Sequence, residues 1–396
     1  MIRAENGIDD IGRRIRDRFT SPPVVVDACL ERIDALNPRL DAFITVLHER
    51  ARGRAREASD EIAAGRWRGP LHGVPVGVKD FYDTAGVRTT AAFEHFKQRV
   101  PGTTAAAVER LEAAGAIVIG KTNMHRLGTG TTGLESDFGP VRNPVNEAYI
   151  PGGSSSGSAA AVAAGLCFAT LDTDAIGSCR LPAACCGVVG FKGTYGLVST
   201  KGILEGEKAD EVILWFAHAA ITARSAEDVS IMLGALAEKT LGPAPTGPLR
   251  VGVAKNFEAD TDVRSAFNAA VDRFRTLGYD LATARAPFDM PRFGDLQTIR
   301  QDREAIAGRA FGDIDVLVLP TTTTAVPAVA AAVNPQFLSP ANTAFANYFG
   351  LPAISVPCGV DPRGLPIGLQ IVGRPGEDAT VLDVARRFEK DYTPAS

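Results

Sequence analysis

The sequence of 396 residues has few lysines, only 5 histidines and no long apolar run. Its 42 Lys and Arg residues are outnumbered by 46 Asp and Glu residues, so it lacks the basic excess that binding to nucleic-acid phosphates requires. The longest nearly uninterrupted apolar stretch, residues 159–171, is shorter than the ~20 residues of a membrane-spanning helix. We therefore expect neither a nucleic-acid partner nor a membrane span.

Metal-binding and secretion signals are also missing. The 6 cysteines form no CxxC pair and have no histidine at zinc-ligand spacing, and residues 1–19 lack the apolar core of a secretion signal. These features predict a cytoplasmic protein with free, mostly buried thiols and no metal site.

The pattern that is present is typical of an α/β protein. Residues 73–80 and 115–122 are short apolar runs bounded by glycines, and residues 103–114 between them have helical spacing. This alternation predicts a sheet with helices on both faces. We expect a single domain over residues 1–396, with a helical region at 1–70, a core at 71–240 and a C-terminal part at 250–396 that completes the sheet.

Two familiar motifs match by letter but not by context. Residues 115–122 read GxxxxGK[ST], yet the four middle residues have the composition of a strand, whereas a phosphate-binding site needs a loop there. Residues 153–157 read GxSxG, which requires a preceding strand and a late histidine, and only His218 follows. We therefore expect neither a nucleotide site nor an ordinary Ser/His hydrolase, although a triad of different chain order would still permit histidine catalysis.

Two lysines are candidates for a base other than histidine. Lys79 and Lys121 each end an apolar run, where burial favours the neutral amine. Lowering a lysine pKa to ~7–8 corresponds to roughly 4 kcal/mol of bias against the ammonium, and a neutral lysine can accept a proton from serine. Context alone does not separate the two, and either could instead extend to solvent.

Two serine-bearing loops flank one expected helix and one expected strand. Residues 152–158 read GGSSSGS and open the helix, and residues 173–180 read TDAIGSCR after the strand. Glycine allows neighbouring backbone N–H groups to converge on one point. The second loop is therefore a candidate oxyanion hole, in which each donor is worth ~3 kcal/mol in acyl transfer.

Together these residues resemble the amidase signature family, serine hydrolases that use Ser, Ser and Lys in place of histidine. The resemblance covers GVPVGVKD (73–80), GAIVIGKTNM (115–124), PGGSSSGSAAAVAAG (151–165) and TDAIGSCRLPAACCGVVGFKGTYG (173–196), and more weakly LPTTTT (319–324) and FGLPAISVPCG (349–359). It implies an amidase-signature fold with a large mixed, mostly parallel central sheet covered by helices on both faces. It also implies a small-molecule amide substrate and no cofactor.

The resemblance assigns roles residue by residue. Ser178 corresponds to the nucleophile, Lys79 to the general base and Ser154 to the bridging serine, which the family holds by a cis peptide. The interval from Ser154 to Ser178 agrees with the family spacing. It further implies an oxyanion hole from the N–H groups of Ala175, Ile176, Gly177 and Ser178, supporting roles for Ser155, Thr173, Asp174 and Arg180, and substrate contacts from Met124, Arg126 and Thr131.

Some positions depart from the family pattern. Ile176 stands where the family has glycine, and its β-branched side chain disfavours positive φ, so we expect a narrowed or tilted oxyanion hole. Arg126 stands where relatives are often acidic, which predicts an electropositive rim or a solvent-facing side chain. Segment 280–312 is short, which predicts an open cleft or a pocket completed by a second subunit in a homodimer. Trp215 and Phe216 are expected in a core strand or, alternatively, as pocket aromatics.

Three functions remain open from the sequence. The first is an amidase that hydrolyses a small, linear carboxamide through an acyl-enzyme on Ser178. The second is the glutaminase-type component of an amidotransferase, which depends on partner subunits. The third is a catalytically weak or vestigial binding protein, motivated by Ile176.

Overall fold

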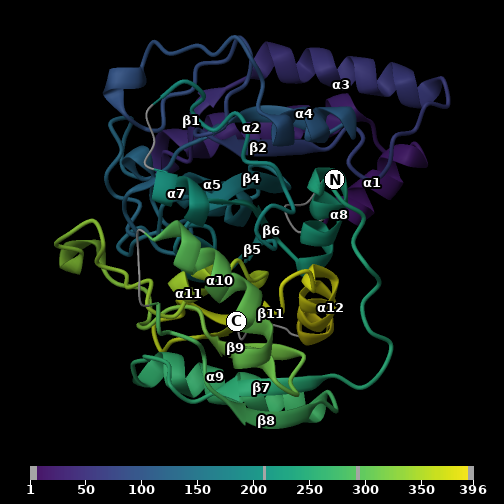
Figure 1. The fold of residues 1–396 in the computed structure, drawn as a ribbon. Coiled ribbons are helices and arrows are strands. Elements are labelled where there is room, and N and C mark those ends of the chain that lie inside the picture. The colour runs from purple at the N-terminus through teal and green to yellow at the C-terminus, as the bar shows by residue number, and fades with distance from the viewer. Residues whose placement is uncertain (1–6, 208–210, 291–294, 391–396) are drawn as a thin grey trace.

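The computed structural model describes residues 7–207, 211–290 and 295–390, in which helices and strands alternate along the chain (Figure 1). The strands are β1 (Phe43–Val46), β2 (Pro75–Lys79), β3 (Ile117–Thr122), β4 (Ala169–Asp174), β5 (Val189–Lys192), β6 (His218–Ala223), β7 (Arg250–Ala254), β8 (Asp280–Ala284), β9 (Val316–Pro320), β10 (Ala353–Val360) and β11 (Pro366–Gly373). The helices are α1 (Ile8–Arg16), α2 (Pro22–Leu40), α3 (His48–Ala63), α4 (Ala106–Ala113), α5 (Ser156–Ala163), α6 (Arg180–Cys186), α7 (Glu211–Phe216), α8 (Ala226–Leu236), α9 (Thr261–Thr276), α10 (Leu296–Ile306), α11 (Ala344–Tyr348) and α12 (Asp378–Glu389).

The strands of the described residues form one 11-stranded sheet in the order β1-β3-β2-β4-β6-β5-β10-β11-β9-β7-β8. N-terminal elements lie at one end of the molecule in Figure 1, and β7, β8 and α9 lie at the other. The last two strands, β10 and β11, return to the middle of the sheet, between β5 and β9. The chain therefore places residues from its two halves side by side near the centre.

The sheet is mixed, as expected, but the prediction that it is mostly parallel is wrong. Pairs β2·β3, β2·β4, β7·β8 and β7·β9 are parallel, whereas β1·β3, β4·β6, β5·β6, β5·β10, β10·β11 and β9·β11 are antiparallel. The helix and strand alternation at 71–122 does give parallel strands. The turn between β10 and β11 is too short for the crossover that a parallel pair needs, so these strands form a hairpin.

Helices cover both faces of the sheet. A Cβ on Gly368 of β11 would lie 2.7 Å from Ala184 of α6, whereas a Cβ on Gly373 of the same strand would lie 2.5 Å from Val381 of α12. Because side chains alternate along a strand, positions five apart face opposite sides. Helix α6 therefore packs on one face and α12 on the other. Helix α5 contacts α6, and α8 contacts α12.

Strand β3, the cysteines and helix α7 bear on separate local predictions. Residues 117–122 form the fully buried strand β3, so the GxxxxGK[ST] match makes no phosphate-binding loop. All 6 cysteines are free and buried, as expected. Trp215 and Phe216 end helix α7, so the expectation that they belong to a strand is wrong. Within the described ranges, no helix combines the length and apolar character that crossing a bilayer requires.

The close contact between α6 and β11 predicts a stability effect. In Gly368→Ala the new methyl would lie 2.7 Å from both Ala184 Cβ and Ser355 Oγ, with little room to move. We expect a loss of about 1–3 kcal/mol in the free energy of unfolding, measured by urea titration. Gly53→Ala in α3, where nothing lies within 4 Å, is the matched control and should be neutral or stabilising. Equal effects of the two variants would contradict this packing.

Candidate active site

A buried lysine and three hydroxyl groups meet at the end of β2. Lys79 Nζ lies 2.8 Å from Ser154 Oγ, 2.9 Å from Ser155 Oγ and 2.9 Å from Thr173 Oγ1, and the lysine is 0% exposed. A neutral amine has two protons and one lone pair, so it can donate to two hydroxyls and accept from the third. The arrangement therefore suits an uncharged lysine that takes a proton from a serine.

The electrostatics of this lysine favour the neutral form. Burial lowers the pKa of Lys79 to about 8, and the carboxylates of Asp172 and Asp174 oppose that shift. Among the described residues, no carboxylate lies within ion-pair distance of Lys79 Nζ. The Asp172 carboxylate instead accepts hydrogen bonds of 2.7 Å from the hydroxyls of Thr170 and Thr222. Its own pKa is raised by burial.

The second candidate lysine has different partners. Lys121 Nζ donates to the Tyr82 carbonyl (2.6 Å) and to Thr89 Oγ1 (2.8 Å), and it lies 3.5 Å from the Asp80 carboxylate. Burial lowers its pKa, and the charge of Asp80 opposes the shift. No serine is among its partners in the described part of the chain, so the structure separates the two lysines that the sequence left equal.

Backbone contacts join the two serine loops. The Gly153–Ser154 peptide bond is cis, and the Ser154 carbonyl accepts a 2.9 Å hydrogen bond from the N–H of His125. The Ser155 N–H donates to the carbonyl of Ser178, also at 2.9 Å. Within the described ranges no hydrogen bond joins the Ser178 hydroxyl to that of Ser154. The structure thus brings Lys79 and Ser154 into contact and places Ser178 beside them through its backbone.

The loop before Ser178 has three free N–H groups rather than four. Gly177, at φ 129°, donates its N–H to Asp174 Oδ1 at 2.8 Å, so this N–H already has a partner and its expected role in an oxyanion hole is not supported. The N–H groups of Ala175, Ile176 and Ser178 have no partner among the described residues. Ile176 is not among the residues with positive φ, so the expected backbone conflict of its β-branched side chain does not arise.

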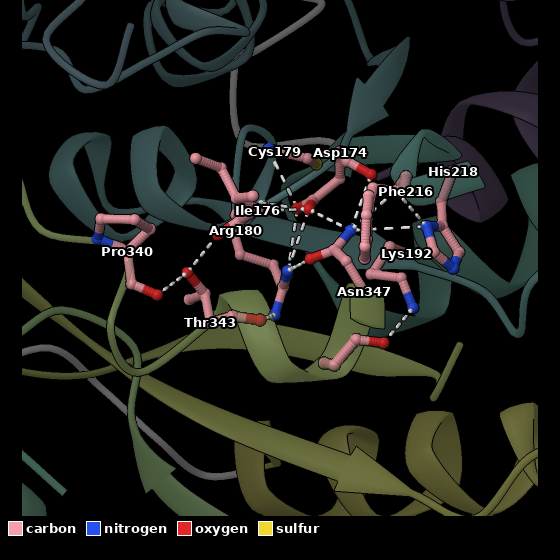
Figure 2. Close-up of polar contacts among 12 residues, drawn as sticks. Asp174, Ile176, Cys179, Arg180, Lys192, Phe216, His218, Pro340, Thr343 and Asn347 are labelled. Carbon is pink, nitrogen blue, oxygen red and sulfur yellow. Dashed lines mark hydrogen bonds and ion pairs between the residues drawn. The ribbon is translucent and has the colours of Figure 1, made fainter. Parts of the chain in front are cut away.

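A buried ion pair between Asp174 and Arg180 flanks the loop of residues 175–178 (Figure 2). Arg180 donates to both carboxylate oxygens of Asp174, at 3.0 and 2.9 Å, and both side chains are 0% exposed. Its Nη1 donates to Gln370 Oε1 (2.5 Å), and its Nη2, which also contacts Asp174, donates to Asn347 Oδ1 (2.6 Å). Burial alone would raise the pKa of Asp174, but the charge and hydrogen bonds of Arg180 outweigh it and hold that pKa well below its usual range.

The expected substrate residues lie on the segment that follows β3. Met124 is fully buried, and Thr131 donates its N–H to the Pro335 carbonyl at 2.7 Å. Arg126 forms ion pairs with Asp137 (3.0 Å) and Glu135 (3.4 Å), so its charge is balanced and an electropositive rim is not supported. Among the described residues, no group of three or more His, Cys, Asp or Glu side chains could hold a metal ion.

Sequence reasoning missed several residues of the site. The sequence could have indicated Asp172, because a charged residue inside an expected buried strand is unusual. His125 had a weaker signal, next to Arg126. Its two buried ring nitrogens have no hydrogen-bond partner among the described residues, Nε2 lies 3.8 Å from the Glu135 carboxylate, and burial lowers the pKa of His125 to about 4. Thr343, Asn347 and Gln370 lie more than 160 residues from Arg180, with no local signal.

The sequence matches the Amidase family over residues 24–292 and 295–382. Together with the large mixed sheet and the lysine and serine cluster, this places the chain in a known class: it belongs to the amidase signature family. The expectation from the sequence motifs is confirmed at this level. The match is divided inside segment 280–312, which the sequence predicts to be short.

Relatives of known name fall within the same family. The chain is 33% identical to the A subunit of glutamyl-tRNA(Gln) amidotransferase from Anaeromyxobacter dehalogenans, covering 98% of this chain and 96% of the relative. Among solved structures it is similar to an amidase (TM-score 0.83, 29% identity, 98% and 100% covered). It is also similar to 6-aminohexanoate cyclic dimer hydrolase with its substrate (TM-score 0.84, 26% identity, 98% and 97% covered).

The chain is shorter than the Anaeromyxobacter relative. The alignment between the two spans 485 positions, against 396 residues here, so at least 89 positions (485 minus 396) have no counterpart in this chain. That segment 280–312 is short compared with relatives stays a prediction.

The buried ion pair predicts a large effect on stability. In Arg180→Met the Asp174 carboxylate would stay buried without its partner, so we expect a loss of about 3–5 kcal/mol at pH 7. Arg180 lowers the pKa of Asp174, so its contribution is present above the unfolded pKa and is lost as pH falls through the folded value. In the variant, burial without the guanidinium raises the pKa of Asp174, so this carboxyl becomes protonated as the pH falls and the deficit should shrink toward pH 4.

Arg386→Met, which breaks an exposed ion pair with Glu227, is the control and should cost less than about 1 kcal/mol. Urea unfolding of both variants between pH 4 and 8 measures the difference. A deficit for Arg180→Met that does not depend on pH would contradict the role of the Asp174 charge.

Proposed function

We propose that the chain hydrolyses the C–N bond of a small carboxamide through an acyl-enzyme on Ser178, with Ser154 and Lys79 as the proton relay. The observation that carries this proposal is the environment of Lys79. It is a fully buried amine with a pKa of about 8, surrounded by hydroxyl groups and without a paired carboxylate among the described residues. Such an amine is suited to accept a proton near neutral pH.

In the proposed reaction, neutral Lys79 accepts the proton of Ser154 while Ser154 accepts that of Ser178. The Ser178 oxygen bonds to the amide carbon, and the C–N bond then breaks as the relay returns a proton to the leaving nitrogen. Water follows the same route and releases a carboxylic acid. The relay requires the Ser178 hydroxyl to point toward Ser154. The χ1 rotamer of Ser178 determines this direction.

The oxyanion of the tetrahedral intermediate would be held by the N–H groups of Ala175, Ile176 and Ser178. These groups have no other partner in the described part of the chain. Preorganised donors of this kind stabilise developing charge without reorganisation, and each is typically worth about 3 kcal/mol.

A second candidate is the glutaminase step of an amidotransferase, supported by the 33% identity to the A subunit of such an enzyme. That step shares the acyl-enzyme with amide hydrolysis and differs in its dependence on other subunits. The third hypothesis, a vestigial binding protein, was based on a backbone conflict at Ile176. Because Ile176 does not have a positive φ, that basis is absent.

The triad can be tested with a fluorophosphonate probe on the purified chain. We expect labelling at Ser178, no labelling in Ser178→Ala and a rate lowered by about 10²–10⁴ in Lys79→Met. Ser156→Ala is the matched control, because its hydroxyl is buried without a hydrogen-bond partner among the described residues, and it should label normally. A folded wild-type chain that is not labelled would overturn the proposal.

A panel of small amides that includes glutamine separates the two candidates. Ammonia release from simple amides by the isolated chain, unaffected by ATP, supports the amidase. Release from glutamine only after partner subunits are added supports the amidotransferase role instead.

The pKa of Lys79 sets the expected pH dependence. Because only the neutral amine accepts a proton, the labelling rate should rise with pH through about 8 and level off above it. Lys79→Met should remove this rise, whereas Lys239→Met, at an exposed position, should keep it. Labelling rates between pH 6 and 10 measure the profile, and a flat wild-type profile would contradict Lys79 as the base.

A further inference from the structure

We propose that Thr343 is a positioning residue for the oxyanion loop, residues 175–178, and that its hydroxyl holds the peptide plane before Ser178 in its working orientation. This inference rests on the proposed function. Thr343 lies directly before α11, is 0% exposed, and is more than 160 residues from the loop in sequence. Figure 2 shows its side chain pointing toward the backbone of Ile176.

The peptide between Ile176 and Gly177 is held at both of its polar atoms. Thr343 Oγ1 donates to the Ile176 carbonyl at 2.5 Å, and the Gly177 N–H donates to Asp174 Oδ1 at 2.8 Å. A planar peptide fixed at its oxygen and at its nitrogen has no rotational freedom left. The orientation of this peptide then sets the directions of the neighbouring N–H groups of Ile176 and Ser178.

The fit around Thr343 is close and specific. A Cβ on Gly177 would lie 2.3 Å from Thr343 Oγ1, so only glycine fits beneath this hydroxyl. The same hydroxyl lies 3.1 Å from the Pro340 carbonyl, a longer contact than that to Ile176. Its one proton is therefore directed mainly to the loop.

Thr343 is itself attached to a firm support. Its carbonyl accepts a 3.1 Å hydrogen bond from Arg180, and Asn347 one turn later donates to the carbonyl of Asp174 at 2.8 Å. Arg303 of α10 donates to the carbonyls of Tyr348 (2.8 Å) and Asn347 (3.1 Å). Asn347 of α11 thus contacts Asp174 before the oxyanion loop and Arg180 after it, and Thr343 contacts the carbonyl of Ile176 within the loop.

The role differs from that of the triad in what it should change. The Thr343 hydroxyl bonds to the carbonyls of Ile176 and Pro340 and, within the described ranges, to neither the lysine nor the serine hydroxyls, so it should not affect the pKa that controls the rate. It should affect the step in which charge develops on the oxygen of the substrate. A displacement of the donors by less than 1 Å is enough to lower such a rate by an order of magnitude or more.

The test uses the fluorophosphonate probe on the full chain, because its tetrahedral adduct places an oxygen in the oxyanion hole. Thr343→Val removes the hydroxyl at nearly constant volume, and Thr343→Ser keeps it. We expect Thr343→Val to lower the maximal inactivation rate about 10- to 100-fold, with the probe's half-saturating concentration within about twofold and the pH midpoint unchanged. Thr343→Ser should stay within about threefold of wild type.

Thr380→Val is the matched control for loss of a buried hydroxyl. Thr380 is 2% exposed, donates to Glu377 Oε2 at 2.7 Å and lies in α12, on the opposite face of the sheet from α6. If Thr343→Val does not fold, Thr343→Ala and Thr343→Ser provide the same comparison of a missing and a retained hydroxyl.

The outcomes are distinguishable. A wild-type chain that labels at Ser178, together with a Thr343→Val variant that labels as fast as wild type or no slower than Thr380→Val, overturns this inference alone. A shifted pH midpoint in Thr343→Val also overturns it, because the hydroxyl would then act on the relay. A folded wild-type chain that does not label overturns the proposed function and this inference with it.

Discussion

The site depends on keeping one amine uncharged inside the protein. Lys79 is completely buried, and its Nζ contacts hydroxyl groups rather than carboxylates. A carboxylate in direct contact would stabilise the ammonium and raise the pKa that burial has lowered. The polar residues of the neighbouring strand β4 can be understood from this constraint. Asp172 directs a carboxylate oxygen to the hydroxyls of Thr170 and Thr222 instead of to the lysine.

The sheet satisfies this constraint by separating its two faces. The face under α5 and α6 carries the polar side chains of the site, including Thr122, which lies 2.7 Å from Ser158 of α5, and Gln370, which contacts Arg180 of α6. The opposite face packs apolar residues against α12. Small residues in α5 and glycines in the strands let the helices on the polar face approach closely, which excludes water from the lysine.

Contiguous parts of the site could be predicted from the sequence, and parts assembled from distant segments could not. The lysine at the end of a strand and the two serine loops are each local patterns of glycine, serine and apolar residues. The choice between Lys79 and Lys121 required the partners of each amine, which sequence context does not give. The supports of the oxyanion loop come from α11 and β11, and their residues have no pattern that links them to Asp174. The mixed sheet was predicted, but its hairpin-rich half was not, because the clearest helix and strand alternation lies in the parallel half.

The two buried basic residues of the site, Lys79 and Arg180, have complementary tasks. Asp174 is needed to fix the backbone of the oxyanion loop, because it accepts hydrogen bonds from the N–H groups of Gly177 and Cys179. Its negative charge also acts to raise the pKa of Lys79. A guanidinium stays charged at any physiological pH and binds a carboxylate through two parallel hydrogen bonds. Arg180 can therefore neutralise Asp174 permanently, which limits the effect of that carboxylate on Lys79. A lysine in place of Arg180 would titrate itself under the same burial, so the loop and the base would no longer be electrostatically independent.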